Sequence, residues 1–442
     1  MSNRGRKRVF TSLLLVVFIF LFFSSRLLVI NQVTGCDDCS ENQIEWVQSY
    51  SGQVKSGGSS MIQTLAGGFV ITGNDYLDEF DDDVLLLKTD SEGAMVWNKT
   101  YGGTDSDRAR QVIQTSDGGF ALAGSTSSFG CCGVASMYLI KTDSEGNKEW
   151  EGIYGGFYYD AAYGLVQTED NGFALAGITY SYGAGQYDAY LVKTDSVGIM
   201  EWNYTYSGVW SGTQYDGAYA VIQTNDGGFA LAGFTSFGYP DMFLVKVDSE
   251  GGEEWIKSYG GLDSDTAYAI IQTNDNGFAL AGFTKAVGSG ESDMLLVKTN
   301  STGYMEWYQT FGGSEYENAH TLIQTLDGGY ALAGSTSSGD FDMFFVKTNS
   351  TGSMEWNCTY GGENADGAFS LIQTSNISYV ILGSSTTEPV ELFTLNNYEF
   401  WLIKIKDPSS IDATVSSFVI SIVSSNLILI FYKIKSKKRK KN

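Results

Sequence analysis

Short apolar runs separated by turn residues recur along most of the chain. Each copy of the pattern holds four runs, typified by Ala269–Thr273, Gly228–Gly233, Tyr190–Asp195 and the residues around Trp202. The runs are rich in β-branched or aromatic residues and bounded by Gly, Asp, Asn or Ser, which is typical of β-strands. The pattern therefore predicts units of four strands. It lacks the 3.6-residue periodicity that a helical repeat requires.

The four-strand unit occurs seven times. Its tryptophan returns at spacings of 49 to 53 residues: Trp46, Trp97, Trp150, Trp202, Trp255, Trp307 and Trp356. Four strands in a unit of this length, repeated seven times, are typical of a β-propeller. The sequence therefore predicts an all-β fold, a seven-bladed β-propeller of four-stranded blades over residues 44–406.

The joints between the runs carry turn residues. Five copies join the first and second strands through a dipeptide that favours positive φ: Asp117-Gly118, Asp226-Gly227, Asp327-Gly328, Asn171-Gly172 and Asn276-Gly277. Such dipeptides predict tight hairpins. Between the third and fourth strands, Asp-Ser-x-Gly at 143–146, 195–198 and 248–251 predicts a three-residue loop with Gly in the left-handed region.

Lysines recur in the third strand of each unit: Lys88, Lys141, Lys193, Lys246, Lys298, Lys347 and Lys404. With a three-residue loop, Asp195 opposes Ile199 and Lys193 opposes Glu201. The same count gives four further pairs: Lys141 with Glu149, Lys246 with Glu254, Lys298 with Glu306 and Lys347 with Glu355. We expect cross-strand ion pairs worth roughly 0.2–1 kcal/mol each. These glutamates are then structural rather than catalytic.

The two ends of the repeat region complement each other. The run from Ile44 to Tyr50 is a fourth strand without a blade, and the last unit ends on its third strand, Phe400 to Lys406. Pairing the two would complete the last blade and leave no open sheet edge. We therefore expect the N-terminal strand to close the ring.

Residues 1–30 carry the pattern of an export signal. Basic residues precede an apolar run from Val9 to Phe23, and Ser24 and Ser25 follow. This pattern predicts a cleaved signal peptide. An uncleaved signal anchor is the alternative, because Arg26 follows at once. Residues 31–43 are predicted to be a linker.

The C-terminal end predicts a membrane anchor. After a linker at 407–413, residues 414–432 contain no charge and are rich in Val, Ile, Leu and Phe, and residues 433–442 are strongly basic. An apolar span with one basic flank places that flank in the cytoplasm. We therefore expect a single-pass protein of the cell membrane, with an extracellular propeller, a transmembrane helix at 414–432 and a cytoplasmic C-terminus.

The excess of acidic residues in the predicted extracellular part limits the classes of partner that it can bind. The two ends hold 12 of the 27 basic residues and one of the 51 acidic ones, so the body carries 15 basic and 50 acidic residues. Such a surface repels nucleic acid and attracts cations or basic partners. It equally serves to keep a surface protein soluble.

Sequons and cysteines agree with export. Six sequons are candidate glycosylation sites: Asn98, Asn203, Asn300, Asn349, Asn357 and Asn376. Five cysteines are too few for a disulfide scaffold. Cys36 with Cys39 and Cys131 with Cys132 are candidate pairs, which leaves one cysteine over and predicts no framework.

The quoted repeats bring a family into view. Units reading Glu-Trp-x-x-Thr-Tyr-Gly-Gly, then Ile-Gln-Thr-x-Asp-Gly-Gly-Phe-Ala-Leu-Ala-Gly, then Leu-Val-Lys-Thr-Asp-Ser-x-Gly resemble the seven-bladed propeller repeats of bacterial and archaeal surface proteins. The resemblance covers residues 44–406. It implies an exported propeller, usually without assigned catalysis. The Asp-x-x-Gly-x-x-x-Trp element is similar, more weakly, to the tryptophan-docking repeat of pyrroloquinoline-quinone enzymes.

The sequence offers little catalytic machinery. His320, the only histidine, takes a position held by Tyr or Phe in other units, which favours a first-strand or core role over catalysis. One histidine excludes His-rich metal sites and argues against a Ser/His/Asp triad. Arg108 and Arg110 are the only arginines of the body, too few for a quinone-clamping set around Cys131 and Cys132. A glycoside hydrolase needs only two carboxylates and stays open.

The loops that escape the repeat indicate a binding face. Connections from second to third strands, and from a fourth strand to the next blade, should share one rim of the ring, here named the variable rim. They carry many aromatic residues: Phe157, Tyr158, Tyr159, Tyr180, Tyr182, Tyr187, Trp210, Tyr215, Phe237 and Tyr239. The acidic stretch Asp75–Asp83 lies there too, and its run Asp78–Asp83 is a candidate calcium site without a recognised spacing.

We therefore expect a membrane-anchored, non-catalytic binding or adhesion module for a cell-surface glycan or protein, with no bound cofactor apart from calcium as a candidate. The predicted ligand-binding residues are Trp210, Tyr158, Tyr159, Tyr182, Tyr239, Asp81, Asp82 and Asp83. Loops on a rigid scaffold commonly carry binding residues. The alternative is an extracellular propeller enzyme, either glycan-active or quinone-dependent.

Overall fold

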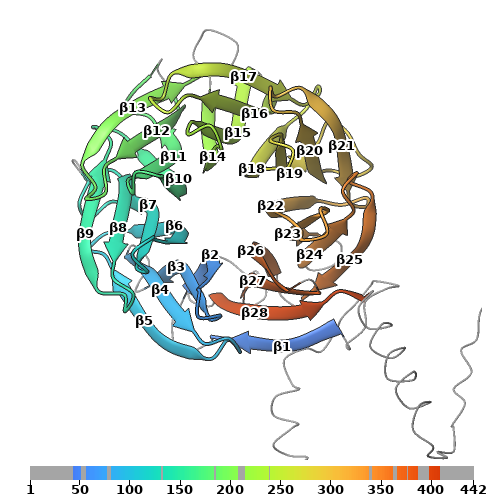
Figure 1. The fold of residues 1–442 in the computed structure, drawn as a ribbon, viewed down its shortest axis with the longest axis horizontal. Helices are drawn as coiled ribbons and strands as arrows, with labels where there is room; N and C mark the ends of the chain where they lie inside the picture. The colour runs from blue at the N-terminus through green and yellow to red at the C-terminus, as the bar shows by residue number, and fades with distance from the viewer. Residues whose placement is uncertain are drawn as a thin grey trace, which may run out of the picture.

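The computed structural model describes residues 43–50, 56–76, 81–130, 133–183, 186–207, 215–237, 239–337, 341–361, 366–375, 377–386 and 398–408. Within these ranges, 28 strands form seven four-stranded antiparallel sheets around one axis (Figure 1). The prediction of an all-β, seven-bladed propeller is confirmed.

The blades follow the order of the chain, with the first strand of each nearest the axis (Figure 1). From the axis outward, blades 1 to 4 are β2 (Ser56–Gln63), β3 (Phe69–Tyr76), β4 (Asp82–Thr89) and β5 (Met95–Tyr101); β6 (Asp107–Gln114), β7 (Phe120–Thr126), β8 (Ser136–Thr142) and β9 (Lys148–Tyr154); β10 (Asp160–Gln167), β11 (Phe173–Thr179), β12 (Asp188–Thr194) and β13 (Met200–Tyr206); β14 (Tyr215–Gln223), β15 (Phe229–Phe237), β16 (Tyr239–Val247) and β17 (Glu253–Tyr259). Blades 5 to 7 are β18 (Asp265–Gln272), β19 (Phe278–Thr284), β20 (Asp293–Thr299) and β21 (Met305–Phe311); β22 (Glu317–Gln324), β23 (Tyr330–Thr336), β24 (Asp342–Thr348) and β25 (Met354–Tyr360); β26 (Asp366–Ser375), β27 (Ser378–Thr386), β28 (Tyr398–Lys406) and β1 (Ile44–Ser49).

The N-terminal strand closes the ring as expected. Strand β1 lies beside β28 and pairs with it antiparallel (Figure 1). In this pairing, Trp46 lies opposite Lys404. Blade 7 thus takes its outer strand from the start of the chain and its three inner strands from the end. Unfolding blade 7 therefore requires the two ends to separate, and no blade is left one strand short.

The turns adopt the predicted left-handed conformations. Gly118 has φ 85° and Asn171 has φ 66°, each in the turn between the first and second strands of its blade. Gly198, in the turn between β12 and β13, has φ 79°, and its N–H donates to the carbonyl of Asp195 at 3.2 Å. Gly and Asn tolerate this region of φ better than other residues, which explains their recurrence at these joints.

Each tryptophan fastens its blade to the next one. The Trp97 ring lies 6.4 Å from the ring of Phe120 in blade 2. A Cβ on Gly146, in the β8–β9 turn, would lie 2.8 Å from the same indole. The Tyr101 hydroxyl donates to the carbonyl of Gly146 at 2.6 Å. The turn glycine thus lets the outer strand of one blade pack directly against the neighbouring turn.

The core lies between blades rather than within any one of them. Ala121 and Ala123 of β7 pack in one cluster with Phe173 and Leu175 of β11. The Phe-Ala-Leu-Ala alternation therefore presents small side chains to one neighbouring blade and bulky ones to the other. This complementarity sets the spacing of neighbouring sheets.

The third-strand lysines form ion pairs, with a register different from the prediction. Lys193 lies opposite Trp202, and a bulge between the partners of Lys193 and Thr194 takes up Glu201. Its Nζ still reaches Glu201 Oε2 at 2.8 Å. The predicted lysine–glutamate contacts are thus confirmed. The predicted pairing of Lys193 directly opposite Glu201 is wrong by one residue, because the loop ends in a β-bulge.

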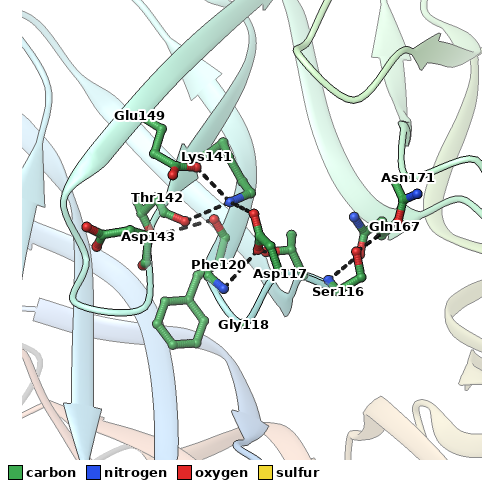
Figure 2. Close-up of polar contacts among 12 residues, drawn as sticks. Ser116, Asp117, Gly118, Phe120, Lys141, Thr142, Asp143, Glu149, Gln167 and Asn171 are labelled. Atoms are coloured by element: carbon green, nitrogen blue, oxygen red, sulfur yellow. Dashed lines mark hydrogen bonds and ion pairs between the residues drawn. The ribbon is translucent and has the colours of Figure 1, made fainter.

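In blades 2 to 6, the third-strand lysine also forms an ion pair with a second carboxylate. Figure 2 shows Lys141 between Asp117 and Glu149, at 2.7 and 2.8 Å, and its Nζ also donates to the Thr142 carbonyl at 2.9 Å. Equivalent triads surround four other lysines: Lys193, Lys246, Lys298 and Lys347. The aspartate of the Asp-Gly turn was not predicted as a partner. Its role explains why that turn so often carries Asp.

The cysteines and the chain ends complete the description. Cys358 on β25 is disulfide-bonded. The candidate pairs Cys36 with Cys39 and Cys131 with Cys132 lie outside the described residues. Among the described residues, no helix has the length and apolarity that crossing a membrane would take. The predicted signal, anchor helix and basic tail lie outside those residues.

Candidate functional site: the variable rim and the axial ring

The two rims of the propeller differ as expected. Five residues join the first and second strands in each of blades 1 to 6. Connections between second and third strands range from one residue, between β15 and β16, to eleven, between β27 and β28. The variable rim therefore holds the segments in which blades differ from one another.

Five tyrosines form a continuous aromatic surface on this rim at blades 3 and 4. We call Tyr158, Tyr159, Tyr180, Tyr187 and Tyr215 the tyrosine cluster. Ring centroids lie 5.3 Å apart for Tyr158 and Tyr180, 5.4 Å for Tyr180 and Tyr187, and 6.1 Å for both Tyr159 with Tyr187 and Tyr187 with Tyr215. Tyr158 is 57% exposed and Tyr215 47%. Mutual packing holds the rings in place while leaving aromatic surface open to solvent.

The remaining predicted aromatic residues take different places. Tyr182 follows the cluster on the β11–β12 loop, where its ring packs on Tyr190 at 5.5 Å and its hydroxyl donates to the Gly155 carbonyl at 2.8 Å. It therefore braces the loop as well as exposing one face. Tyr239 begins β16 in blade 4 and is exposed. Trp210 lies outside the described residues, so the prediction for it stands untested.

The predicted acidic residues lie apart from the cluster, on blade 1. Asp82 is buried and forms an ion pair with Arg108 of blade 2. Burial, together with the charges of Asp81 and Asp107, raises the pKa of Asp83 to about 6. Across the described ranges, no group of three or more Asp, Glu, His or Cys is arranged to hold a metal ion. The candidate calcium run continues into residues 78–80, outside those ranges.

Buried carboxylates at the rim have a structural role. The Gly103 N–H donates to Asp107 Oδ2 at 2.8 Å, and the Gly261 N–H donates to Asp265 Oδ2 at 2.9 Å. In both cases the first residue of an inner strand anchors the Gly-Gly loop that enters the blade. This repeated contact gives Asp107 and Asp265 a structural role that requires no catalytic function.

A ring of side chains around the axis was missed by sequence reasoning. Every inner strand carries a bulge near its start, after its third residue or, in β14, after its fourth. The bulged residues, here called the axial ring, are Ser59, Arg110, Tyr163, Tyr219, Tyr268, His320 and Phe369. Centroids of successive aromatic members lie 5.0 to 5.5 Å apart from Tyr163 to Phe369. The available signal was the column itself, in which six of seven residues are large.

His320 is a structural member of this ring. Its imidazole stacks on Phe369 at 5.1 Å, and its Nδ1 lies 2.9 Å from the carbonyl of Ala368. Burial lowers the pKa of His320, although the Ala368 carbonyl opposes this. It lies in a first strand, as predicted, and is neutral at pH 7.

Arg110 is the charged member of the ring. Its side chain is exposed, and its guanidinium lies 5.8 Å from the ring centroid of Tyr163. Within the described part of the chain, it forms no ion pair. Arg108, the other arginine of the body, is paired with Asp82. The axial ring therefore presents one uncompensated cation beside aromatic faces.

The described sequons occupy two kinds of position. Asn98, Asn203 and Asn357 follow the tryptophans of outer strands β5, β13 and β25. Asn300 and Asn349 begin turns between third and fourth strands, where their Oδ1 atoms accept backbone N–H groups. Asn376 lies outside the described residues. Glycosylation of all six remains a prediction.

Comparison with known proteins identifies no family for this chain. No protein-family model matches the chain, and no curated protein sequence matches it significantly. A protein of unknown function from Dyadobacter fermentans is 10% identical, with 82% of this chain and 100% of that one covered and a TM-score of 0.44. Sqt1 from Chaetomium thermophilum is 11% identical, covering 78% and 82%, with a TM-score of 0.47. BBS1N in complex with ARL6DN is 8% identical, covering 82% and 96%, with a TM-score of 0.46.

Proposed function

We propose that this propeller is a non-catalytic binding module that recognises a glycan through its variable rim. The observation that carries the proposal is the tyrosine cluster. Five rings from two connecting loops and the start of β14 pack against one another on the rim, two pairs edge to face and two pairs tilted, and keep exposed surface. Fixed aromatic faces suit sugar rings, since they offer apolar contact and hydroxyl groups with little loss of side-chain freedom.

The placement of the cluster separates it from the structural aromatic residues. The repeated tryptophans and phenylalanines pack between blades, whereas Tyr158 and Tyr180 touch each other on connecting loops. Such exposed aromatic groups are the residues that commonly dominate binding energies. A protein partner would use the same surface, and the experiment below separates the two.

The proposed setting is the cell surface. The export signal and the apolar span at 414–432, both read from the sequence, support an anchor with an extracellular propeller. Because the linker at 407–413 is short, the propeller would stand close to its membrane. The six sequons agree with this setting.

The enzyme alternative gains little from the site. The rim carboxylates Asp107 and Asp265 are buried and bound to loop N–H groups, and the triad carboxylates such as Asp117 and Glu149 are bound to lysines. Neither set is placed as the exposed acid and base of a glycosidase. A binding role requires no such pair.

The test is a binding array of surface glycans and surface proteins probed with the ectodomain. We expect glycan binding that the double substitution Tyr158→Ala, Tyr180→Ala reduces at least about tenfold, since truncating an aromatic anchor costs roughly 2 kcal/mol or more. Tyr304→Ala is the matched control, because Tyr304 is 63% exposed in a turn of the opposite rim. Unchanged binding by a folded double variant would refute the site. Binding to proteins alone would refute the glycan.

A further inference from the structure

The tyrosine cluster and the axial ring share their strands. Tyr159 directly precedes β10, which carries Tyr163, and Tyr215 begins β14, which carries Tyr219. Tyr159 and Arg110 both act electrostatically on Tyr163, whose pKa is raised mainly by burial. A ligand on the cluster is therefore close to the one charged member of the ring.

Within the described residues, Arg110 forms no ion pair, which is also true of Lys88 and Lys257, and it is the charged member of the axial ring. The chain has 51 acidic and 27 basic residues, and the buried lysines of the triads each hold two carboxylates. The Arg110 guanidinium lies over the face of Tyr163, 5.8 Å from its ring centroid. Its neighbours in the ring are Tyr163 and the small Ser59, so the guanidinium has an aromatic wall on one side and little bulk on the other.

The chemistry of this arrangement selects a single carboxylate. A guanidinium binds a carboxylate through two parallel hydrogen bonds, and a stacked arginine keeps its donors available at its edge. A polyanion such as nucleic acid would meet the acidic surface of the body and be repelled. A saccharide that is neutral except for one carboxylate on its terminal sugar can bind the guanidinium and avoids strong repulsion by the acidic surface.

We propose that Arg110 binds the carboxylate of a uronic acid residue, at the end of a glycan whose other sugar rings lie on the tyrosine cluster. The inference rests on the proposed function, because it names the class of glycan that the same rim recognises. It assigns to the axial ring the selection of acidic over neutral sugars, and to the tyrosine cluster the general affinity for sugar rings.

The experiment uses cellotriose whose terminal glucose is oxidised to glucuronic acid, here called the acid, and compares it with its methyl ester, which keeps the sugar rings and removes the single charge. By calorimetry on the ectodomain, we expect the acid to bind at least about tenfold more tightly, since hydrogen bonds to charged groups are worth roughly 1.5–3 kcal/mol. Arg110→Gln should bring the two affinities together, and Arg110→Lys should restore part of the preference. Lys257→Gln is the matched control, because Lys257 is a cation lying 4.4 Å from the ring centroid of Tyr304.

The outcomes separate this inference from the proposed function. Equal affinity of the parent protein for acid and ester, or a preference for the acid that survives Arg110→Gln, overturns the role of Arg110 and leaves the rim site standing. A preference lost in Arg110→Gln and kept in Lys257→Gln supports it. If the acid does not bind while neutral glycans bind and depend on Tyr158, the uronic acid is wrong and the rim site holds.

Discussion

Replacing Lys347 by Met tests whether the lysine triads stabilise the blades. The Lys347 side chain is fully buried, and its Nζ lies 2.9 Å from Asp327 Oδ2, 2.8 Å from Glu355 Oε2 and 2.8 Å from the Thr348 carbonyl. Methionine has a similar length but makes none of these contacts. Blade 6 then loses the charge that ties its two hairpins together.

The magnitude follows from the exposure of the partners. Breaking a fully buried ion pair costs about 3–5 kcal/mol, because a charge is left without compensation. Here the Asp327 and Glu355 side chains are 58% and 44% exposed, so water takes over much of their solvation. The Thr348 carbonyl is buried with its strand and loses a charged donor. We therefore expect Lys347→Met to lower the free energy of unfolding by about 2 kcal/mol.

Blade 1 supplies the control. Ala66 and Val96 stand where blades 2 to 6 carry the turn aspartate and the glutamate. Lys88 accordingly contacts the Ser144 carbonyl at 3.2 Å and the Trp97 ring at 5.7 Å, with no ion pair in the described part of the chain. Lys88→Met should cost less than about 1 kcal/mol. Urea titrations followed by tryptophan fluorescence measure both changes.

The pH dependence gives an independent check. Burial raises the pKa of Asp327, but Thr325 and Lys347 outweigh it and hold the pKa at about 2, below the ordinary 3.8. A lowered carboxyl pKa contributes stability above pH 3.8 that is lost as the pH falls toward 2. The cost of Lys347→Met should therefore be greatest above pH 5 and shrink below pH 4. Equal costs for Lys347→Met and Lys88→Met, independent of pH, would refute the reasoning.

Two further substitutions test the blade contacts and the axial ring. Gly146→Ala should cost about 2 kcal/mol more than Gly118→Ala, because both have positive φ but only Gly146 would place a Cβ against Trp97, at 2.8 Å; equal losses in urea would exclude the indole contact. Since burial lowers the pKa of His320, neutral His320 stabilises the fold above pH 6.5, and this contribution is lost as the pH falls. The melting temperature should therefore fall less between pH 7 and pH 5 in His320→Phe than in the parent protein. An equal fall in both would show that folding does not lower the pKa of His320.

The fold was predictable because seven copies of the unit repeat the same strand and turn patterns. Alternation of Phe and Leu with Ala, Asp-Gly or Asn-Gly at hairpins and a tryptophan per unit each specify local structure, and their spacing specifies blades. The error in register at Lys193 has a physical cause. A bulge depends on backbone dihedrals at Glu201 rather than on side-chain pattern, and one extra residue shifts every pair beyond it.

The candidate site was only partly predictable for the opposite reason. Tyr158 and Tyr159 stood out as exceptions to the repeat, but their contacts with Tyr180 and Tyr187 depend on loop paths that no other blade shares. The sequence places the axial-ring residues in one column of the repeat, but it does not show that they line the axis, because they differ in type, from Ser59 to Arg110. What they share is a bulged backbone position, which becomes visible only when the strands are paired.

The acidity of the body is largely accounted for by the fold, and this bears on function. Asp117 and Glu149 hold a lysine, Asp143 accepts two N–H groups in its turn, and Asp107 anchors a loop glycine. Each role recurs from blade to blade. Asp83 does not fit these roles, since it has no ion pair within the described ranges and its pKa is raised to about 6 by burial and neighbouring carboxylates. The abundance of carboxylates is therefore no argument for catalysis, and residues that depart from the repeat carry the functional information.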